Sequence, residues 1–173
     1  NKGNPDLKPE ESEAFEVGLK YNTYFLRAHI AGFYRKGKNM IDWVKEKPED
    51  IWESQNLTKV DNLGFETNLS LLPRELGNER FFIRKIELGY AFIHQDKDSE
   101  GYISNYALDY LKHKFTAQLS HSIWKGFSAT WYVRWQDRAG SYTKYENLKP
   151  AYEEPYAPYC LVDMKVNWEY QRL

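Results

Sequence analysis

The sequence predicts an all-β protein that forms part of an antiparallel transmembrane β-barrel, with about seven long strands in meander order. Three observations support this prediction. Apolar and polar side chains alternate along seven runs of the 173-residue chain, as in strands with one apolar face. Several runs keep the alternation for about 10 residues, close to the roughly 9–11 that a tilted strand needs to cross a bilayer. The connections are short and long in turn, as in outer-membrane barrels with periplasmic turns and extracellular loops.

The first two runs follow a turn-rich lead, GNPDLKPEES. Residues 15–21 alternate Phe, Val, Leu and Tyr with Glu, Gly and Lys, which gives one apolar and one polar face. A short turn at Asn22 and Thr23 leads into the second run, residues 26–35. We expect a long connection over residues 36–55.

The third run, residues 62–71, has the cleanest alternation in the chain. Pro73 opens a compact turn over residues 73–79, because proline presets the backbone for a turn. The fourth run covers residues 85–92, and a loop rich in Asp, Ser and Gly follows over roughly residues 95–105.

The last three runs repeat the pattern. The fifth covers residues 114–120, and a tight turn at Lys125-Gly126 starts the sixth, residues 127–136, which is heavily aromatic. A third long connection, residues 139–155, precedes the seventh run, residues 160–169. Short turns therefore join the runs at one end and long loops at the other, so the lead is expected to be extracellular and the seventh strand to end on the periplasmic side.

Charged side chains lie inside the runs, on their polar faces. In a dry core each would be costly unless paired, whereas a wide, water-filled or plugged barrel admits them. A soluble sheet with one solvated face explains them equally well and stays open as an alternative. Seven strands are too few for a barrel whose smallest members have about eight, so a fragment is expected. Among these charged residues are Lys20, Arg27, Glu66, Lys85, Glu87, Arg134 and Lys165.

The charge balance argues against a nucleic-acid partner. The chain carries 24 basic and 25 acidic residues, mixed along its length, for a net charge of −1, so it has no basic patch for a polyanion. The single cysteine, Cys160, excludes an internal disulfide framework and a cysteine-rich zinc site. No run of about 18 apolar residues occurs, so no transmembrane helix is expected.

Neither a metal site nor an enzymatic site is predicted. The histidines are scattered over separate runs without ligand spacing. His113 and His121 bracket the outward residues of the fifth run, which suits the two interfacial ends of a membrane crossing as well as plain surface positions. No nucleophile elbow, phosphate loop or metalloprotease helix motif occurs, so no catalytic residue or cofactor is expected. The four histidines are His29, His94, His113 and His121.

The lead, extended to GNPDLKPEESEAFEVGLKY, resembles the segment that opens later strands of TonB-dependent receptors, in which Asn-Pro and Lys-Pro-Glu precede a Glu-x-Gly-x-Lys strand. Three further stretches agree in order. They are Phe-Tyr-Arg followed by Met40-Ile41-Asp42, the stretch at residues 60–66 that ends Gly-Phe-Glu, and KHKF followed by a strand that ends QDRAG. Within this family the likeness is greatest to cobalamin-receptor-like members.

This resemblance implies a barrel of about 22 strands with a plugged lumen, in the outer membrane of a Gram-negative bacterium. It implies a receptor that binds a large scarce nutrient, of the cobalamin or ferric siderophore type, and imports it with energy from a TonB complex. The implied partners are outer-membrane lipid, the receptor's own N-terminal plug domain, the TonB complex and the small-molecule nutrient. Residues 1–173 are then part of one barrel domain, with the plug and the closing strands outside this sequence.

Aromatic side chains in the long connections are the candidate ligand contacts, since aromatic rings offer rigid, amphipathic contact area. The alternative is that they pack loops together or belong to the outer aromatic girdle. A soluble all-β module that holds a glycan in aromatic loops is the alternative function, and its apolar faces would meet in a core. The candidates are Trp43, Trp52, Tyr102, Tyr142, Tyr145 and Tyr152.

Overall fold

The computed structural model describes residues 2–47, 49–77, 81–98, 101–104, 110–146 and 148–169. Within these residues, no helix has the length and apolar character to cross a membrane. The elements in chain order are β1 (Glu11–Asn22), β2 (Leu26–Lys45), β3 (Glu53–Leu71), the 3-10 helix η1 (Pro73–Leu76), β4 (Ile83–Asp98), β5 (Ile103–Ser104), β6 (Leu111–Trp124), β7 (Phe127–Arg138), β8 (Ser141–Glu146), β9 (Lys149–Pro155) and β10 (Tyr159–Trp168).

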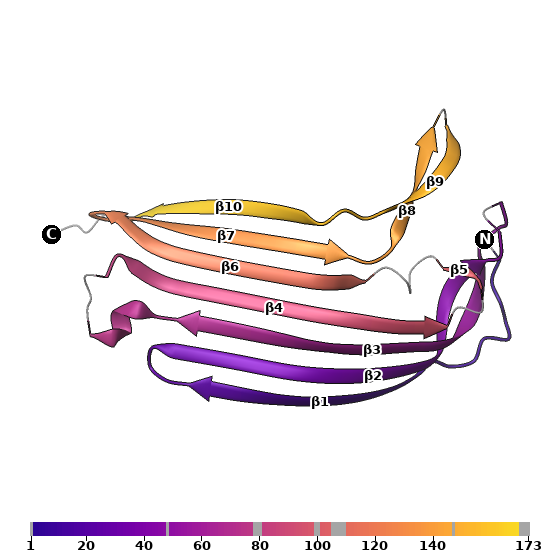
Figure 1. Cartoon of the computed structure of the whole chain (residues 1–173), viewed down its shortest axis with the longest axis horizontal. Helices are drawn as coiled ribbons and strands as arrows, with labels where there is room; N and C mark the ends of the chain where they lie inside the picture. The colour runs from indigo at the N-terminus through magenta and orange to yellow at the C-terminus, as the bar shows by residue number, and fades with distance from the viewer. Residues whose placement is uncertain are drawn as a thin grey trace.

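The seven predicted runs form one curved antiparallel sheet in the order β1-β2-β3-β4-β6-β7-β10 (Figure 1). Every neighbouring pair is antiparallel and follows the chain order, so the sheet is a meander. Strands β1 and β10 form its two edges, which leaves the wall open. The prediction of a partial antiparallel barrel wall with seven long strands is therefore confirmed.

Short turns close the sheet at one end, on the left of Figure 1. The Thr23 hydroxyl accepts a hydrogen bond from the Leu26 N–H at 3.0 Å, which fixes the β1–β2 turn. Pro73 starts η1, and Gly77 ends it with φ +94°, a conformation that glycine adopts without strain. Gly126 has φ +76° in the β6–β7 turn. The three short turns predicted from the sequence are therefore present in the structure.

The long connections are more ordered than predicted. Residues 36–55 were expected to form a loop, but β2 continues to Lys45 and β3 begins at Glu53, and the two strands pair out to Val44 and Glu53. This prediction was wrong because two strands that pair with each other satisfy their backbone hydrogen bonds without any apolar alternation. Likewise β4 runs on to Asp98, and residues 139–155 contain the β8–β9 hairpin. Residue 105, the end of the second predicted loop, lies outside the described residues.

Most apolar side chains of the long strands lie on one exposed face of the sheet. Phe15, Val17 and Leu19 of β1 are 68, 76 and 75 % exposed. Among the described residues the buried hydrophobic side chains are Ala31, Val44, Val60 and Ala129. A soluble sandwich would bury two apolar faces against each other, so this single layer has the outward apolar face of a barrel wall.

This outward face has the strand length and the borders of a membrane belt. Its apolar stretch on β2 runs from Leu26 to Tyr34, close to the roughly 9–11 residues that a tilted strand needs to cross a bilayer. At the border nearer the loop end, the Tyr34 hydroxyl donates to Asp61 Oδ2 at 3.1 Å. At the border nearer the turn end, the rings of Phe127 and Trp168 stack with their centroids 5.9 Å apart.

The two outward histidines pair with aromatic residues. His113 Nδ1 lies 2.8 Å from the Tyr90 hydroxyl, near the loop end of the sheet. The Trp131 indole N–H donates to His121 Nε2 at 3.1 Å, near the turn end. Both histidines therefore lie at the ends of the apolar stretch of β6, the arrangement that suits interfacial positions.

Candidate ligand-binding surface at the loop end

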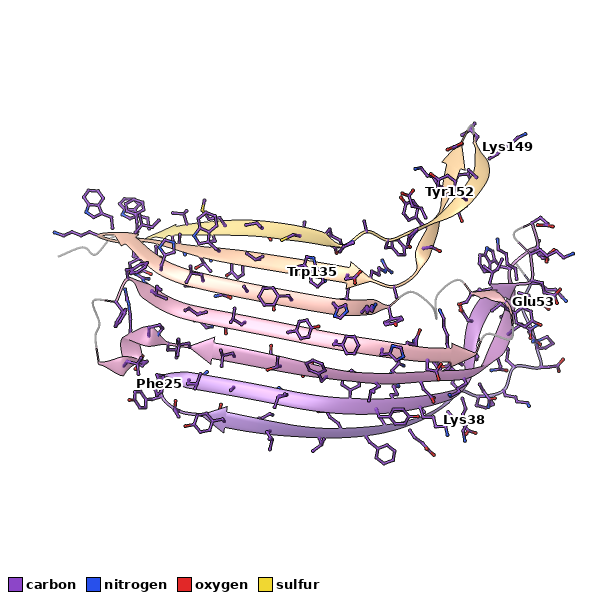
Figure 2. The ribbon with its side chains drawn as sticks, viewed as in Figure 1. Phe25, Lys38, Glu53, Trp135, Lys149 and Tyr152 are labelled. Atoms are coloured by element: carbon purple, nitrogen blue, oxygen red, sulfur yellow. The ribbon has the colours of Figure 1, made fainter. Side chains whose placement is uncertain are left out.

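The six candidate aromatic residues form two groups, both at the loop end of the sheet. Trp43 lies on β2, Trp52 immediately before β3 and Tyr102 immediately before β5. The other three lie on the β8–β9 hairpin, which projects beyond the wall, as Figure 2 shows for Tyr152. Trp43, Tyr142, Tyr145 and Tyr152 were expected in loops but belong to strands, because the long connections are themselves paired.

The first group surrounds a small core in what we call the β2–β3 arm, residues 36–61 together with β5. Strand β5 pairs with the end of β2, where Val44 is 1 % exposed. The Asp42 carboxylate is also buried, and it accepts hydrogen bonds from the Trp43 N–H at 2.7 Å and from the Ser104 hydroxyl. A buried carboxylate held in this way restricts the positions of β2 and β5 relative to each other.

The lead that contains the Asn-Pro and Lys-Pro-Glu motifs is hydrogen-bonded along the β2–β3 arm. The Asn4 N–H donates to Ser54 Oγ at 3.0 Å. The Asn56 side chain accepts from the Lys8 N–H at 2.8 Å, and Glu10 accepts from the Ile41 N–H at 2.8 Å. The sequence singled out this segment as a motif but did not predict its contacts, since its partners lie 31 to 50 residues away.

Trp52 presents a ring beside a cation. The Lys45 Nζ atom lies 4.7 Å from the centroid of the Trp52 ring, and Lys2 forms an ion pair with the neighbouring Glu53 at 3.0 Å. Trp52 and Tyr102 are half-buried, so each keeps part of its surface open to a ligand. The sequence separation of Lys45 and Trp52 did not predict that these two side chains would be in contact.

The β8–β9 hairpin combines tyrosines with one ion pair. Lys144 Nζ lies 3.2 Å from Glu154 Oε2 and 5.3 Å from the centroid of the Tyr152 ring. The Tyr142 and Tyr156 rings are 5.7 Å apart, and the Arg138 guanidinium lies 4.9 Å from the Tyr156 ring. Tyr145 is 63 % exposed. Cations therefore lie against the Tyr152 and Tyr156 rings, and Tyr145 presents an exposed ring.

The polar contacts of the hairpin shift its pKa values in a consistent way. The hydrogen bond to Lys144, and then that from Tyr142, lowers the pKa of Glu154. The hydrogen bond with Tyr152, and then that with Glu154, raises the pKa of Lys144. Both shifts favour the charged pair, so it persists through the neutral range.

The hairpin should loosen when the solution is acidified. Because the pKa of Glu154 is lowered by folding, its stabilising contribution is present above the ordinary carboxyl range and is lost as the pH falls through the lowered value. The raised pKa of Lys144 gives the opposite dependence, a loss only at strongly alkaline pH. Amide hydrogen exchange of residues 141–155 in the intact protein, corrected for intrinsic rates, should be faster at pH 3 than at pH 7. In Glu154→Gln the corrected exchange rates at pH 3 and at pH 7 should be equal. Equal corrected rates at the two pH values in the unmodified protein would contradict the prediction.

The inner face of the sheet carries a polar hollow of about 430 Å³ lined by all seven long strands. Because both edge strands line it, the sheet curves toward this side. The register places its polar residues in rows, so that Lys20, His29 and Asn68 are successive partners across β1, β2 and β3. This face therefore has the character of the lumen side of a barrel wall. Its charged lining residues are Lys20, Arg27, Glu87, Arg134 and Asp163.

The described residues contain no group of three or more His, Cys, Asp or Glu side chains that could hold a metal ion. Cys160 is exposed on β10. The described residues at the loop end provide an aromatic and charged contact surface.

Comparison with known proteins assigns this wall to a family. The sequence profile described as TonB dependent receptor-like, beta-barrel, matches residues 1–173. The chain belongs to this family. It is therefore part of an outer-membrane barrel of a Gram-negative bacterium, and the family expectation drawn from the lead motif is confirmed.

Two curated relatives within the TonB-dependent receptors are vitamin B12 transporters named BtuB. The protein from Vibrio vulnificus is 28 % identical over 105 residues, which cover 53 % of this chain and 17 % of the relative. The protein from Photobacterium profundum is 26 % identical over 133 residues, covering 73 % and 21 %. The matched segments thus span about a fifth of the length of these relatives.

Solved structures of TonB-dependent receptors share the fold. The copper transporter OprC matches with a TM-score of 0.68 at 15 % identity, over 97 % of this chain and 24 % of that structure. The ferric enterobactin receptor PfeA of Pseudomonas aeruginosa matches with a TM-score of 0.65 at 19 % identity, over 96 % and 25 %. At these identities the likeness establishes the fold of the wall.

Proposed function

We propose that this chain is part of an outer-membrane receptor that binds a large scarce nutrient and imports it with energy supplied through TonB. Residues 1–173 then form part of one barrel domain, and the plug domain and closing strands lie elsewhere in the receptor. The observation that carries the proposal is the single wall with an apolar outer face, a polar inner face and an aromatic loop end. These three features support a receptor that binds its ligand at the loop end and encloses a polar lumen.

Cobalamin is the first candidate for the nutrient, and a ferric siderophore is the second. The two curated relatives are vitamin B12 transporters, whereas the structural neighbours include iron, copper and siderophore proteins. The relatives compared are transporters and receptors, which is consistent with a chain that is not an enzyme. The partners of this function are outer-membrane lipid, the receptor's plug, the TonB complex and the nutrient itself.

The exposed aromatic residues of the hairpin are the proposed ligand contacts with the clearest test. Tyr145 and Tyr152 are 63 and 49 % exposed, so their removal does not open a core. Stacking and apolar contact by two rings are worth about 1–3 kcal/mol together, so the double variant Y145A/Y152A should weaken ligand binding about tenfold or more. Trp43, Trp52, Tyr102 and Tyr142 are proposed to complete the same surface.

The experiment uses the full-length receptor, expressed in a Gram-negative host that lacks its own cobalamin receptor. Uptake of radiolabelled cyanocobalamin and of ferric siderophores is measured with and without functional TonB, and binding is measured on the same cells. Y145A/Y152A should lower binding of the transported ligand, while Y24A should not. Tyr24 is equally exposed at 68 % but lies in the β1–β2 turn at the opposite end. Uptake that is independent of TonB would contradict the transport proposal, and equal binding by both variants would contradict the ligand surface.

A further inference from the structure

At the turn end of the wall, two arginine side chains converge on one serine hydroxyl. Arg74, in η1, donates from Nη2 to Ser122 Oγ at 2.7 Å. Arg84, on β4, donates from Nε to the same oxygen at 3.0 Å. Arg74 Nε also donates to the Phe81 carbonyl at 3.0 Å, which holds that guanidinium in place. The two donor nitrogens therefore lie less than about 6 Å apart.

The fold builds this arrangement from three separate segments. The pairing of β4 with β6 shifts by one residue between Ile83 and Lys85, so Arg84 occupies a β-bulge. Bulges redirect a side chain, and this one brings Arg84 to Ser122. The Ser122 N–H donates to the Phe82 carbonyl at 2.7 Å, which fixes the serine opposite the bulge. The site is therefore anchored by backbone pairing on both sides.

The charges of this cluster are not balanced within the described part of the chain. Two guanidinium groups at this separation repel each other, and none of the ion pairs found among the described residues involves Arg74 or Arg84. The nearby Lys85 is already paired with Glu87 at 2.8 Å. Each guanidinium has five N–H donors, and the contacts described use only three of the ten. The remaining donors suit an oxyanion that both arginines bind at once.

We propose that Arg74 and Arg84, oriented by Ser122, form a phosphate-binding site at the periplasmic end of the wall. A phosphate group is negatively charged and holds its oxygens in a tetrahedral arrangement, so two guanidinium groups can bind it from different directions, whereas the two oxygens of a carboxylate lie in one plane. The phosphate can come from a lipid headgroup or from free phosphate. Phe81 and Phe82, which shortly precede Arg84 in sequence, are 44 and 60 % exposed, as expected for rings at a membrane interface. The proposal is independent of nutrient import.

The test uses the full-length receptor in a phosphate-free maltoside detergent. Equilibrium dialysis with radiolabelled inorganic phosphate measures binding of free phosphate. Native mass spectrometry after addition of phosphatidylglycerol, or of diacylglycerol, measures binding of a lipid with or without a phosphate. Loss of one charge-assisted contact should weaken binding about tenfold or more in Arg74→Ala and in Arg84→Ala.

Lys125→Ala is the matched control, because Lys125 is an exposed cation of the β6–β7 turn at the same end of the sheet. Arg84→Lys keeps the charge but loses the fork, and it should bind more weakly than the unmodified receptor even if Arg84→Ala fails to fold. Arginine-dependent binding of inorganic phosphate indicates a free-phosphate site. Arginine-dependent retention of phosphatidylglycerol alone indicates a headgroup site. Binding of neither ligand, or binding that the arginine variants leave unchanged, overturns the proposal.

Discussion

Replacing Ala117 by lysine should destabilise the receptor in the membrane by about 2–4 kcal/mol, the cost of a lysine on the lipid face near the bilayer midplane. Ala117 lies on β6, halfway between His113 and His121, and its register partners are Leu88 and Val133 on the outward face. The substitution removes almost no packing surface, so the effect isolates the transfer of a charge into hydrocarbon.

Gln118→Lys is the matched control for this effect. Gln118 is the adjacent residue on the same strand, so its side chain points to the opposite, polar face, where its register partner is Glu87. We expect its effect to stay within about 0.5 kcal/mol, because the lysine remains in a polar environment. Urea titration of the full-length receptor folded into lipid vesicles, followed by tryptophan fluorescence, measures both free energies. Equal effects of the two substitutions would show that the face assignment of β6 is wrong.

Gly64→Ala should be the most damaging small substitution within the sheet. A Cβ atom at Gly64 would lie 2.5 Å from the Phe92 carbonyl oxygen and 2.5 Å from Cζ of Phe33. The backbone oxygen belongs to the β3–β4 pairing and cannot move without stretching it. Overpacking of this kind costs on the order of 1–3 kcal/mol, and Gly64→Val should prevent folding of the wall in the same vesicle assay.

Gly32→Ala provides the comparison, since Gly32 lies on the neighbouring β2. A Cβ atom there would meet only the Gly64 carbonyl oxygen, at 3.9 Å, which is an ordinary contact. Its effect should be neutral or slightly stabilising, because alanine restricts the unfolded chain more than glycine does. A loss of stability in Gly32→Ala as large as that in Gly64→Ala would indicate a general need for glycine in these strands rather than a local close approach.

The sequence by itself determined the strands, the turns and the two faces of the wall. These features follow from local geometry, because a strand turns alternate side chains to opposite sides whatever surrounds it. The alternation at residues 15–21 predicted β1, and Pro73 and Gly126 marked turns that the structure contains. The lead motif also indicated the family, which the profile match confirmed.

Where a strand ends, and whether a short hairpin forms, depended on hydrogen-bonded pairing with a neighbouring strand. Beyond Arg35 the apolar alternation stops, yet β2 continues to Lys45, because its backbone hydrogen bonds are made with β3 whether or not its side chains face lipid. The β8–β9 hairpin pairs Tyr142 with Glu154 through a connection that includes Leu148 at φ +63°, a conformation with no sequence signal at leucine. Aromatic residues expected in loops are consequently held on strands.

Contacts between distant segments were decided by the tertiary structure alone. Arg74, Arg84 and Ser122 meet because the β4–β6 register and its bulge bring together residues up to 48 positions apart. The hydrogen bond from Asn4 to Ser54 depends in the same way on where the lead crosses the β2–β3 arm. Register is a property of paired strands, set jointly by both, so a single strand's sequence determines which face a side chain occupies but not which side chain it meets.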